Sequence, residues 1–69
     1  MQEMLVISSM IHSVGYDERH SLLEIEFTSG NIYRYQAVPK EVYRGLMSSG
    51  SKGRYFEEQI NGRFRYSRM

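Results

Sequence analysis

"LLEIEFTSGNIYRYQAVP", residues 22–39, is the stretch that decides the fold of this 69-residue chain. In residues 23–27 large apolar side chains alternate with glutamates, which is typical of a β-strand with one face in water. Residues 28–30, "TSG", supply a turn. In residues 33–35 two tyrosines then flank an arginine. The stretch therefore predicts a β-hairpin.

The length of the turn fixes which faces of the two strands meet. A two-residue loop at Ser29-Gly30 places both tyrosines on the wet face, where they form a platform for stacking. A three-residue loop, residues 28–30, puts the glycine at a left-handed bulge position and the tyrosines opposite apolar residues. Because this register also sets opposite charges side by side, it is the one we predict. The predicted cross-strand pairs are Tyr33 with Ile25, Tyr35 with Leu23 and Arg34 with Glu24, which makes Tyr33 and Tyr35 a core aromatic motif.

Two helices and a last strand follow the hairpin. Pro39 opens the first helix, where its missing N–H costs nothing, and Gly50 ends it. Ser51 can cap a second helix, which Asn61-Gly62 closes. "RFRYSR", residues 63–68, alternates arginines with aromatic residues and predicts a strand with a cationic outer face.

Residues 10–21, "MIHSVGYDERHS", predict another strand that leads into a polar turn, with a bulge near Ser13 to bring its apolar residues onto one face. The resulting order is β-β-β-α-α-β. We therefore expect an α+β fold in which two short helices pack on one face of a small antiparallel sheet. Residues 9–69 form one domain, and residues 1–8 flank it as an extra strand or as an interface.

Composition limits the classes of protein to be considered. A chain of 69 residues without cysteine has a thin stability margin and no disulfides or thiolate metal sites. Glu3 stands where a signal peptide carries positive charge, and the apolar run 4–7 is too short to span a membrane. We expect a cytoplasmic, soluble chain with no membrane partner.

Charge is distributed unevenly along the chain. Residues 1–33 hold one arginine against five acidic residues, a balance of −4, whereas residues 34–69 hold eight cations against three acidic residues, a balance of +5. The two halves either pair with each other or leave a positive surface for RNA or another acidic partner. The candidate nucleic-acid or phosphate contacts are Arg34, Lys52, Arg54, Arg63, Arg65 and Arg68.

Two of these groups have a specific local setting. On the predicted last strand, Arg63 and Arg65 lie on one side about 7 Å apart, close to the phosphate spacing of a nucleic acid, although such arginines also protect a sheet edge. "SSGSKGR", residues 48–54, either cradles a phosphate at a helix start or is a tight interhelical turn. It lacks the spacing of a Walker loop.

No group of residues suggests catalysis. His12 and His20 are the only imidazoles and have no partner carboxylate at ligand spacing, so we expect no metal site. Glu57 and Glu58 are neighbours on a helix and point in different directions, which does not suit an acid–base pair. We expect a protein that is not an enzyme and has no cofactor.

The chain resembles a known family through "SSMIHSVGYD" (8–17), "LLEIEFTSGNIYRYQAVP" (22–39), "EVYRGLM" (41–47) and "SKGRYF" (51–56). In this order and spacing the motifs are similar to the KTSC domain, which is named for the C-terminus of lysyl-tRNA synthetase and also occurs as short bacterial and phage-type proteins. The resemblance covers residues 8 to about 66. It implies no established activity, and it implies RNA binding only by association with the synthetase.

Three functions fit the sequence. A nucleic-acid-binding module would grip phosphates through its basic half and offer Tyr43 or Tyr55 as exposed stacking residues. A homo-oligomeric interaction module would bury "MLVI", residues 4–7, between copies. A small assembly would hold a phosphorylated ligand such as a nucleotide at residues 51–54.

Overall fold

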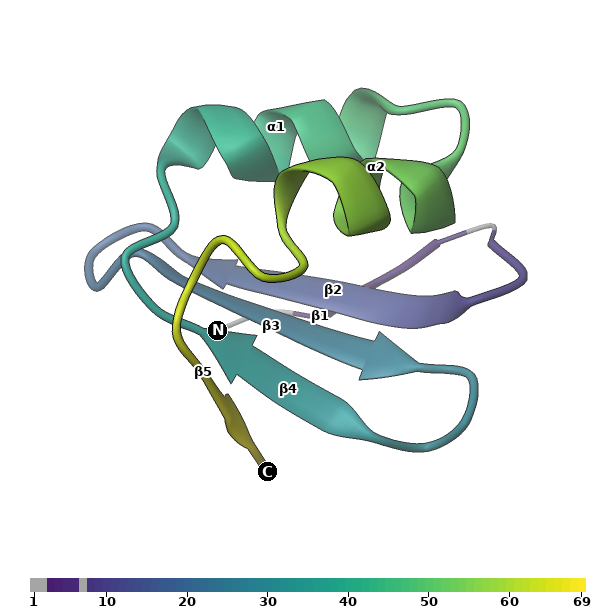
Figure 1. The fold of residues 1–69 in the computed structure, drawn as a ribbon, viewed down its shortest axis with the longest axis horizontal. Helices are drawn as coiled ribbons and strands as arrows, with labels where there is room; N and C mark the ends of the chain where they lie inside the picture. Colours follow the sequence, from purple (N-terminus) through teal and green to yellow (C-terminus); the bar gives the residue numbers. More distant parts are fainter. Residues whose placement is uncertain (1–2, 7) are drawn as a thin grey trace.

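One antiparallel sheet of five strands carries both helices on a single face (Figure 1). The computed structural model describes residues 3–6 and 8–69. The strands lie in chain order across the sheet, from β1 at one edge to β5 at the other. This arrangement confirms the predicted α+β fold, to which the residues before Ile11 add a strand. The elements are β1 (Glu3–Leu5), β2 (Ile11–Asp17), β3 (Leu22–Phe27), β4 (Ile32–Tyr35), α1 (Lys40–Ser48), α2 (Lys52–Gln59) and β5 (Tyr66–Arg68).

The β3–β4 hairpin has the predicted register. Gly30 adopts a positive φ of 97°, and its N–H donates to the carbonyl of Phe27 at 2.9 Å. A glycine at this position avoids the Cβ clash that a left-handed backbone imposes on other residues. Arg34 lies opposite Glu24, and its Nη2 donates to the carboxylate at 2.9 Å. The other confirmed pairs are Tyr33 with Ile25 and Tyr35 with Leu23.

The predicted irregularity in the upstream strand is also present. The β2–β3 register shifts between Ile11 and Ser13, so that β2 contains an extra residue at this point. Because of this bulge, Ile11 and Val14 both reach the interior although they have opposite parity, and both are fully buried.

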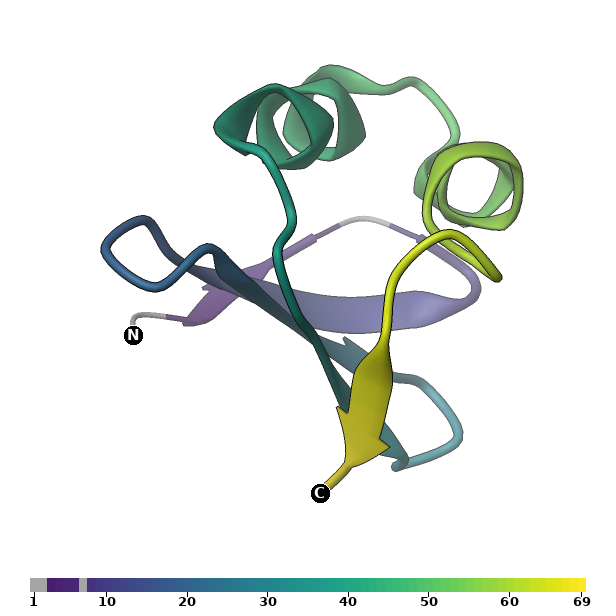
Figure 2. The ribbon, with the colours of Figure 1, turned by 60° about the vertical axis from the view of Figure 1, so that its left-hand side comes forward.

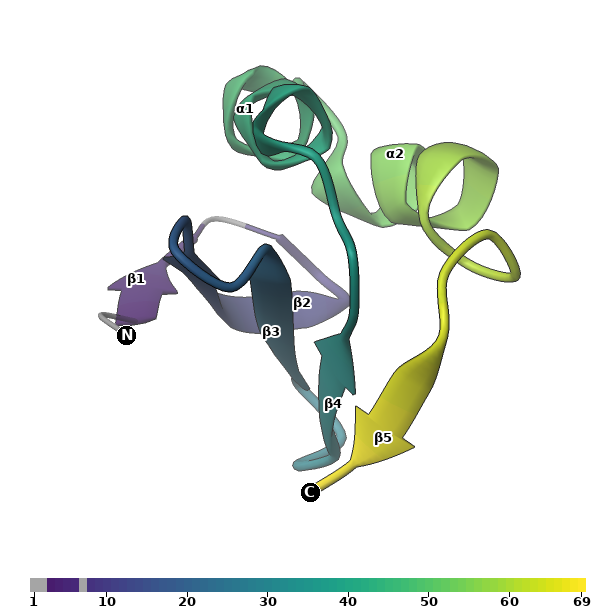
Figure 3. The same ribbon diagram turned by 90° about the vertical axis from the view of Figure 1, so that its left-hand side faces the viewer.

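The core lies between the sheet and the two helices, which stand side by side over one face (Figures 2 and 3). Tyr35 is buried and Tyr33 is partly buried against the core, both on the helix side of the sheet. Tyr16 stacks on Tyr43 of α1 with ring centroids 4.7 Å apart, which ties α1 to β2. The buried apolar residues are Ile11, Val14, Leu23, Ile25, Tyr35, Val38, Leu46, Phe56 and Ile60.

The first helix is slightly shorter than the sequence predicts. It begins at Lys40, because Pro39 has an extended ψ of 151° and is the N-cap rather than the first helical residue. It ends at Ser48, because Ser49 is already extended, so the chain leaves the helix before Gly50. These differences lie within the usual uncertainty of helix ends.

The prediction of a strand over all of "RFRYSR" was wrong, since β5 contains only its last three residues. After α2, Gly62 adopts a positive φ of 78°, and the N–H of Arg63 donates to the carbonyl of Ile60 at 3.0 Å. The end of the helix thus uses these residues in a turn. Arg63 and Arg65 therefore both lie before the strand, so they are not neighbours on one side of it as predicted.

Two carboxyl groups meet on the outer face of the sheet, which none of the described helices covers. Gly15 of β2 lies between Glu3 of β1 and Glu24 of β3 in the ladder. Burial raises the pKa of Glu3 from 4.5 to about 7, and a hydrogen bond to Glu24 and the charge of Glu24 add to this shift. The same hydrogen bond lowers the pKa of Glu24, and the contact with Arg34 lowers it further by a smaller amount. Glu3 therefore holds the proton of this pair.

Stability should depend on pH through Glu3. A carboxyl group whose pKa is raised on folding contributes stability at low pH, and this contribution is lost as the pH rises from about 4.5 to about 7. Glu3→Gln keeps a neutral donor that cannot ionise. The Tm difference between Glu3→Gln and wild type should therefore be a few degrees more positive at pH 8 than at pH 5. Solvent exposure of the side chain keeps this effect small. Circular dichroism melts at both pH values test this, with Glu41→Gln on α1 as the control; parallel pH profiles of wild type and Glu3→Gln would contradict it.

Candidate nucleic-acid interface

A hollow of about 340 Å³ opens between the β3–β4 hairpin, α2 and β5. Its volume is at the lower end of the range of small-ligand sites, about 300–1,000 Å³. Five of its eleven lining residues are aromatic, and they come from four different elements. We call this hollow the aromatic cleft, defined by Phe27, Tyr33, Tyr35, Phe56 and Tyr66.

The rings of the cleft support one another edge to face. Phe27 and Phe56 have centroids 5.2 Å apart with their planes at 73°, and Tyr33 and Tyr66 have centroids 5.3 Å apart at 86°. These geometries are the preferred ones for aromatic pairs. Tyr66 lies opposite Tyr35 on the helix side of the sheet and is 59% exposed. A ligand can therefore reach Tyr66 and the partly buried rings of Phe27 and Tyr33, whereas Tyr35 and Phe56 are buried.

Polar groups complete the cleft. Glu57 of α2 lines it, and the side-chain amide of Asn61 donates to the Glu57 Oε2 at 3.1 Å. Asn31 lines it from the hairpin and accepts a hydrogen bond from the Arg68 Nη2 at 2.8 Å. Burial, and after it the nearby charges including that of Glu57, raises the pKa of Tyr35 to about 12. The Tyr35 hydroxyl is therefore neutral at physiological pH.

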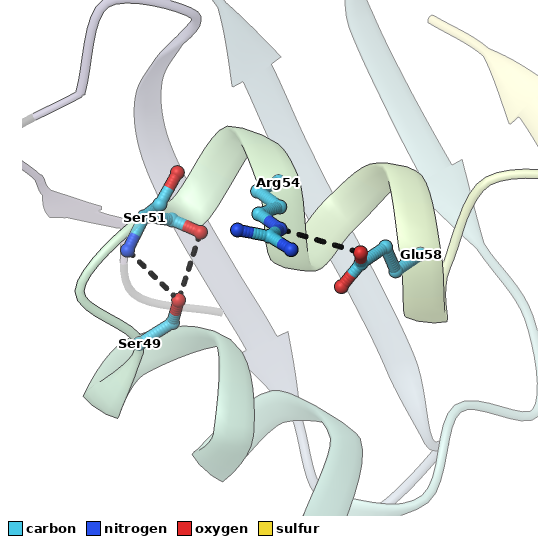
Figure 4. A network of polar contacts seen from close by, with 4 residues as sticks. All are labelled: Ser49, Ser51, Arg54 and Glu58. Atoms are coloured by element: carbon cyan, nitrogen blue, oxygen red, sulfur yellow. Dashed lines mark hydrogen bonds and ion pairs between the residues drawn. The ribbon is translucent and has the colours of Figure 1, made fainter.

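A second hollow, of about 470 Å³, lies at the start of α2 and is lined by residues 50–54. Met10 and Glu57 line both hollows, so the two adjoin along α2. The predicted phosphate cradle falls here. The loop bonds to itself, however: the Ser49 hydroxyl accepts from the Ser51 N–H at 3.1 Å and donates to the Ser51 carbonyl at 2.8 Å (Figure 4).

This arrangement favours the interhelical turn over a backbone cradle. Ser51 occupies the N-cap position of α2, but its hydroxyl forms no cap hydrogen bond within the described part of the chain. Its N–H is already bonded and does not face a vacant site. What the second hollow offers to an anion is therefore the side chains of Lys52 and Arg54.

The cations of the basic half have two kinds of partner. Arg34 and Lys40 pair with acidic residues of the first half of the chain, at 2.9 and 2.8 Å, as the pairing interpretation of the charge asymmetry predicts. Arg54 pairs with Glu58 on the next turn of α2 at 3.3 Å (Figure 4). Three other cations donate to neutral oxygens. Lys52 Nζ donates to the Ser49 carbonyl at 3.1 Å, and Arg63 Nε donates to the Glu58 carbonyl at 2.9 Å. Arg68 Nη2 donates to the side-chain oxygen of Asn31 at 2.8 Å.

The structure does not gather the predicted arginines into one cluster. Arg34 lies on β4 beside β5, as expected, but its side chain is on the outer face with Glu24, whereas Arg68 lies opposite Tyr33 on the helix side. The Arg34 Nε is buried without a hydrogen-bond partner among the described residues. Arg65 is exposed immediately before β5.

The two tyrosines proposed as exposed stacking residues are both used in packing. Tyr43 is half-buried against Tyr16, and Tyr55 is half-buried over Gly45 of α1. The exposed ring is instead Tyr66, which the sequence placed only as an alternating residue of the last strand. Its exposure follows from its position at the sheet edge, beyond the cover of α2, and no local pattern in the sequence carries that information.

Two other findings concern the chemistry of the described residues, 3–6 and 8–69. No group of three or more histidine, cysteine, aspartate or glutamate side chains among them is placed to hold a metal ion. In the same part of the chain, neither helix has the length and apolar character needed to cross a bilayer.

The fold and the cleft define a small α+β domain with an aromatic site between a sheet edge and a helix. Residues 7–64 match the family model of the KTSC domain. A crystal structure of a KTSC domain protein from Yersinia pestis has a TM-score of 0.96 to this chain, with 40% identity, and the match covers 99% of this chain and 96% of that one. The chain belongs to the KTSC domain family.

Relatives with this domain occur in two settings. An uncharacterized protein from Stutzerimonas stutzeri is 41% identical over 70 residues, which cover 100% of this chain and 99% of that protein. A lysine–tRNA ligase from Nostoc punctiforme is 36% identical over 61 residues, which cover 88% of this chain but 11% of the ligase. The domain therefore occurs in a protein of similar length and within a much longer enzyme.

Proposed function

We propose that this KTSC domain is a non-catalytic module that binds single-stranded nucleic acid, RNA in particular. The binding groove is formed by the aromatic cleft and the adjoining hollow at the start of α2. The observation that carries the proposal is an open aromatic cleft with Arg68 bonded to Asn31 of its wall and Lys52 in the adjoining hollow. Tyr66 offers a stacking surface, and the side chains of Lys52, Arg63 and Arg68 each donate to a neutral oxygen. Stacking on aromatic rings combined with a positively charged groove is the usual way in which proteins hold single strands.

RNA is the preferred partner for two reasons. A base can enter the cleft only if it is not stacked on its neighbours in the strand. Unpaired bases of this kind are common in RNA loops and ends. The relatives named lysine–tRNA ligase provide the second reason, since a domain like this one is part of proteins whose name refers to a tRNA. Self-association through the exposed Met4 and Leu5 of β1 stays a separate prediction.

Removing the exposed ring should weaken RNA binding. Tyr66→Ala is expected to lower the affinity for a fluorescein-labelled single-stranded RNA by about 5- to 150-fold, the effect of losing one base–aromatic stack. Fluorescence anisotropy at 50 mM salt measures this. Leu5→Ala is the matched control, because Leu5 is 77% exposed and lies on the opposite edge strand, so its loss should leave the affinity unchanged.

Salt dependence gives an independent measurement of the phosphate contacts. Arg68→Gln should reduce the slope of log affinity against log salt by about 1, the expected change when one phosphate contact is lost. If wild-type protein binds neither single-stranded RNA nor single-stranded DNA at 50 mM salt, the proposal is wrong.

A further inference from the structure

The aromatic cleft contains one acidic group, and this group is placed to interact with the edge of a ring held between the aromatic walls. Among the residues that line the cleft, only Glu57 carries a charge. The amide of Asn61 donates to its Oε2 at 3.1 Å, which orients the carboxylate and leaves the other oxygen without a bond to this amide. Glu57 lines the cleft together with Tyr33, Tyr35 and Tyr66.

The four bases offer different groups to a carboxylate. An ionised carboxylate only accepts hydrogen bonds, and it binds best to two parallel N–H donors. The Watson–Crick edge of guanine presents such a pair, its ring N1–H and its exocyclic amino group. Adenine presents one donor group beside one acceptor, cytosine presents one donor group beside two acceptors, and uracil presents one donor between two acceptors. All three would therefore bring a lone pair toward the Glu57 oxygens.

From these features we infer that the aromatic cleft is a guanine-selective subsite, in which Glu57 accepts hydrogen bonds from the guanine Watson–Crick edge while the ring packs against Tyr66 and Tyr33. The inference rests on the proposed function and specifies the base that it recognises. The same chemistry would accept guanine from a single-stranded RNA or from a free guanine nucleotide. In both cases a phosphate can reach Arg68, which is fixed beside the cleft through Asn31.

An organic cation is the other ligand that an aromatic site with a carboxylate can attract, through cation–π contacts. The surroundings of this cleft oppose it. Arg68 is anchored to a residue of the cleft wall, and Lys52 lines the adjoining hollow. Two cations beside one carboxylate favour a ligand that combines a donor edge with a negative group, as a guanine nucleotide does.

The test compares four labelled nine-nucleotide RNAs, UUUUXUUUU, in which X is guanine, adenine, cytosine or uracil. The guanine probe should bind wild-type protein about 5- to 150-fold more tightly than each of the others, the discrimination that a bidentate base contact provides. Glu57→Gln replaces one acceptor with a donor, so it should abolish this preference. Guanosine monophosphate should compete with the guanine probe, and adenosine monophosphate should compete more weakly.

Glu58→Gln is the matched control. It removes the same charge from the adjacent position of α2, but Glu58 contacts Arg54 and does not line the cleft. Both variants change the overall charge equally, so only the loss of guanine preference in Glu57→Gln supports the inference.

The remaining outcomes would each overturn a defined statement. Equal binding of the four probes would overturn the inference and leave RNA binding in place, as would a guanine preference that survives Glu57→Gln. Displacement of the guanine probe by choline in place of guanosine monophosphate would show a cation site. The absence of binding to every probe at 50 mM salt would overturn the proposed function and the inference together.

Discussion

Leu46→Ala should abolish cooperative folding of the domain. Leu46 is fully buried and is the one residue of α1 that belongs to the buried core, so its truncation leaves a cavity beneath α1. Large-to-small changes of this kind cost about 2–5 kcal/mol. A single core in a chain of this size rarely supplies more than about 3–5 kcal/mol, so little or no stability should remain.

Urea unfolding followed by far-UV circular dichroism measures the effect. Arg44→Ala, at an exposed position of the same helix, should leave the free energy of unfolding within about 0.5 kcal/mol of wild type. Leu46→Met nearly conserves volume and should cost less than about 1.5 kcal/mol, so it keeps the position measurable if the alanine variant does not fold. A loss below about 1 kcal/mol for Leu46→Ala would show that α1 is held by other contacts.

Gly45→Ala should also destabilise the domain, and the sign of its effect should reverse when Tyr55 is removed. A Cβ at Gly45 would lie 2.7 Å from the Cζ of Tyr55, so the ring that rests on this glycine would have to move. Overpacking of this kind costs about 1–3 kcal/mol, and the roughly 1 kcal/mol that alanine gains over glycine within a helix reduces this to a net loss of up to about 2 kcal/mol. A fall in Tm of about 4–8 °C per kcal/mol is expected.

A double-mutant cycle separates the two effects. In a Tyr55→Ala background no ring opposes the new methyl group, and Gly45→Ala should then stabilise the protein through helix propensity alone. Gly50→Ala is the control, because a Cβ there has no atom within 4 Å among the described residues. If Gly45→Ala is stabilising in the wild-type background as well, the Tyr55 ring does not hold the two helices at this distance.

The central hairpin could be predicted from its sequence because its determinants are local. Gly30 is placed where a left-handed backbone is required, and the pairing of Glu24 with Arg34 is possible only in the register that also buries the apolar residues. Each of these signals lies within 14 residues of the others in the chain. Local agreement of this kind specifies register strongly.

The last strand was predicted less well because its start depends on distant parts of the structure. The alternation in "RFRYSR" fits a strand, but the end of α2 uses the residues up to Arg63 in a turn, and β4 is only four residues long. Neither the helix end nor the length of the neighbouring strand can be read from the alternation itself. The expected side-by-side pair of Arg63 and Arg65 was lost for this reason.

The aromatic cleft could not be predicted for a related reason. Its rings come from β3, β4, α2 and β5, and they meet only after the hairpin has packed under α2. In the sequence, Glu57 stands out only as the neighbour of Glu58, in a pair that does not suit acid–base chemistry. Because the two side chains point in different directions, Glu57 lines the cleft while Glu58 pairs with Arg54.

The positions of β1 and β5 at opposite edges of the sheet bear on how the domain can be joined to other polypeptides (Figure 3). A polypeptide attached ahead of β1 starts at the edge remote from Tyr66, whereas one attached behind Met69 starts beside Tyr66 and Arg68. Fusion partners and purification tags placed on the β1 side should therefore leave the groove accessible. The same additions on the β5 side would crowd its entrance.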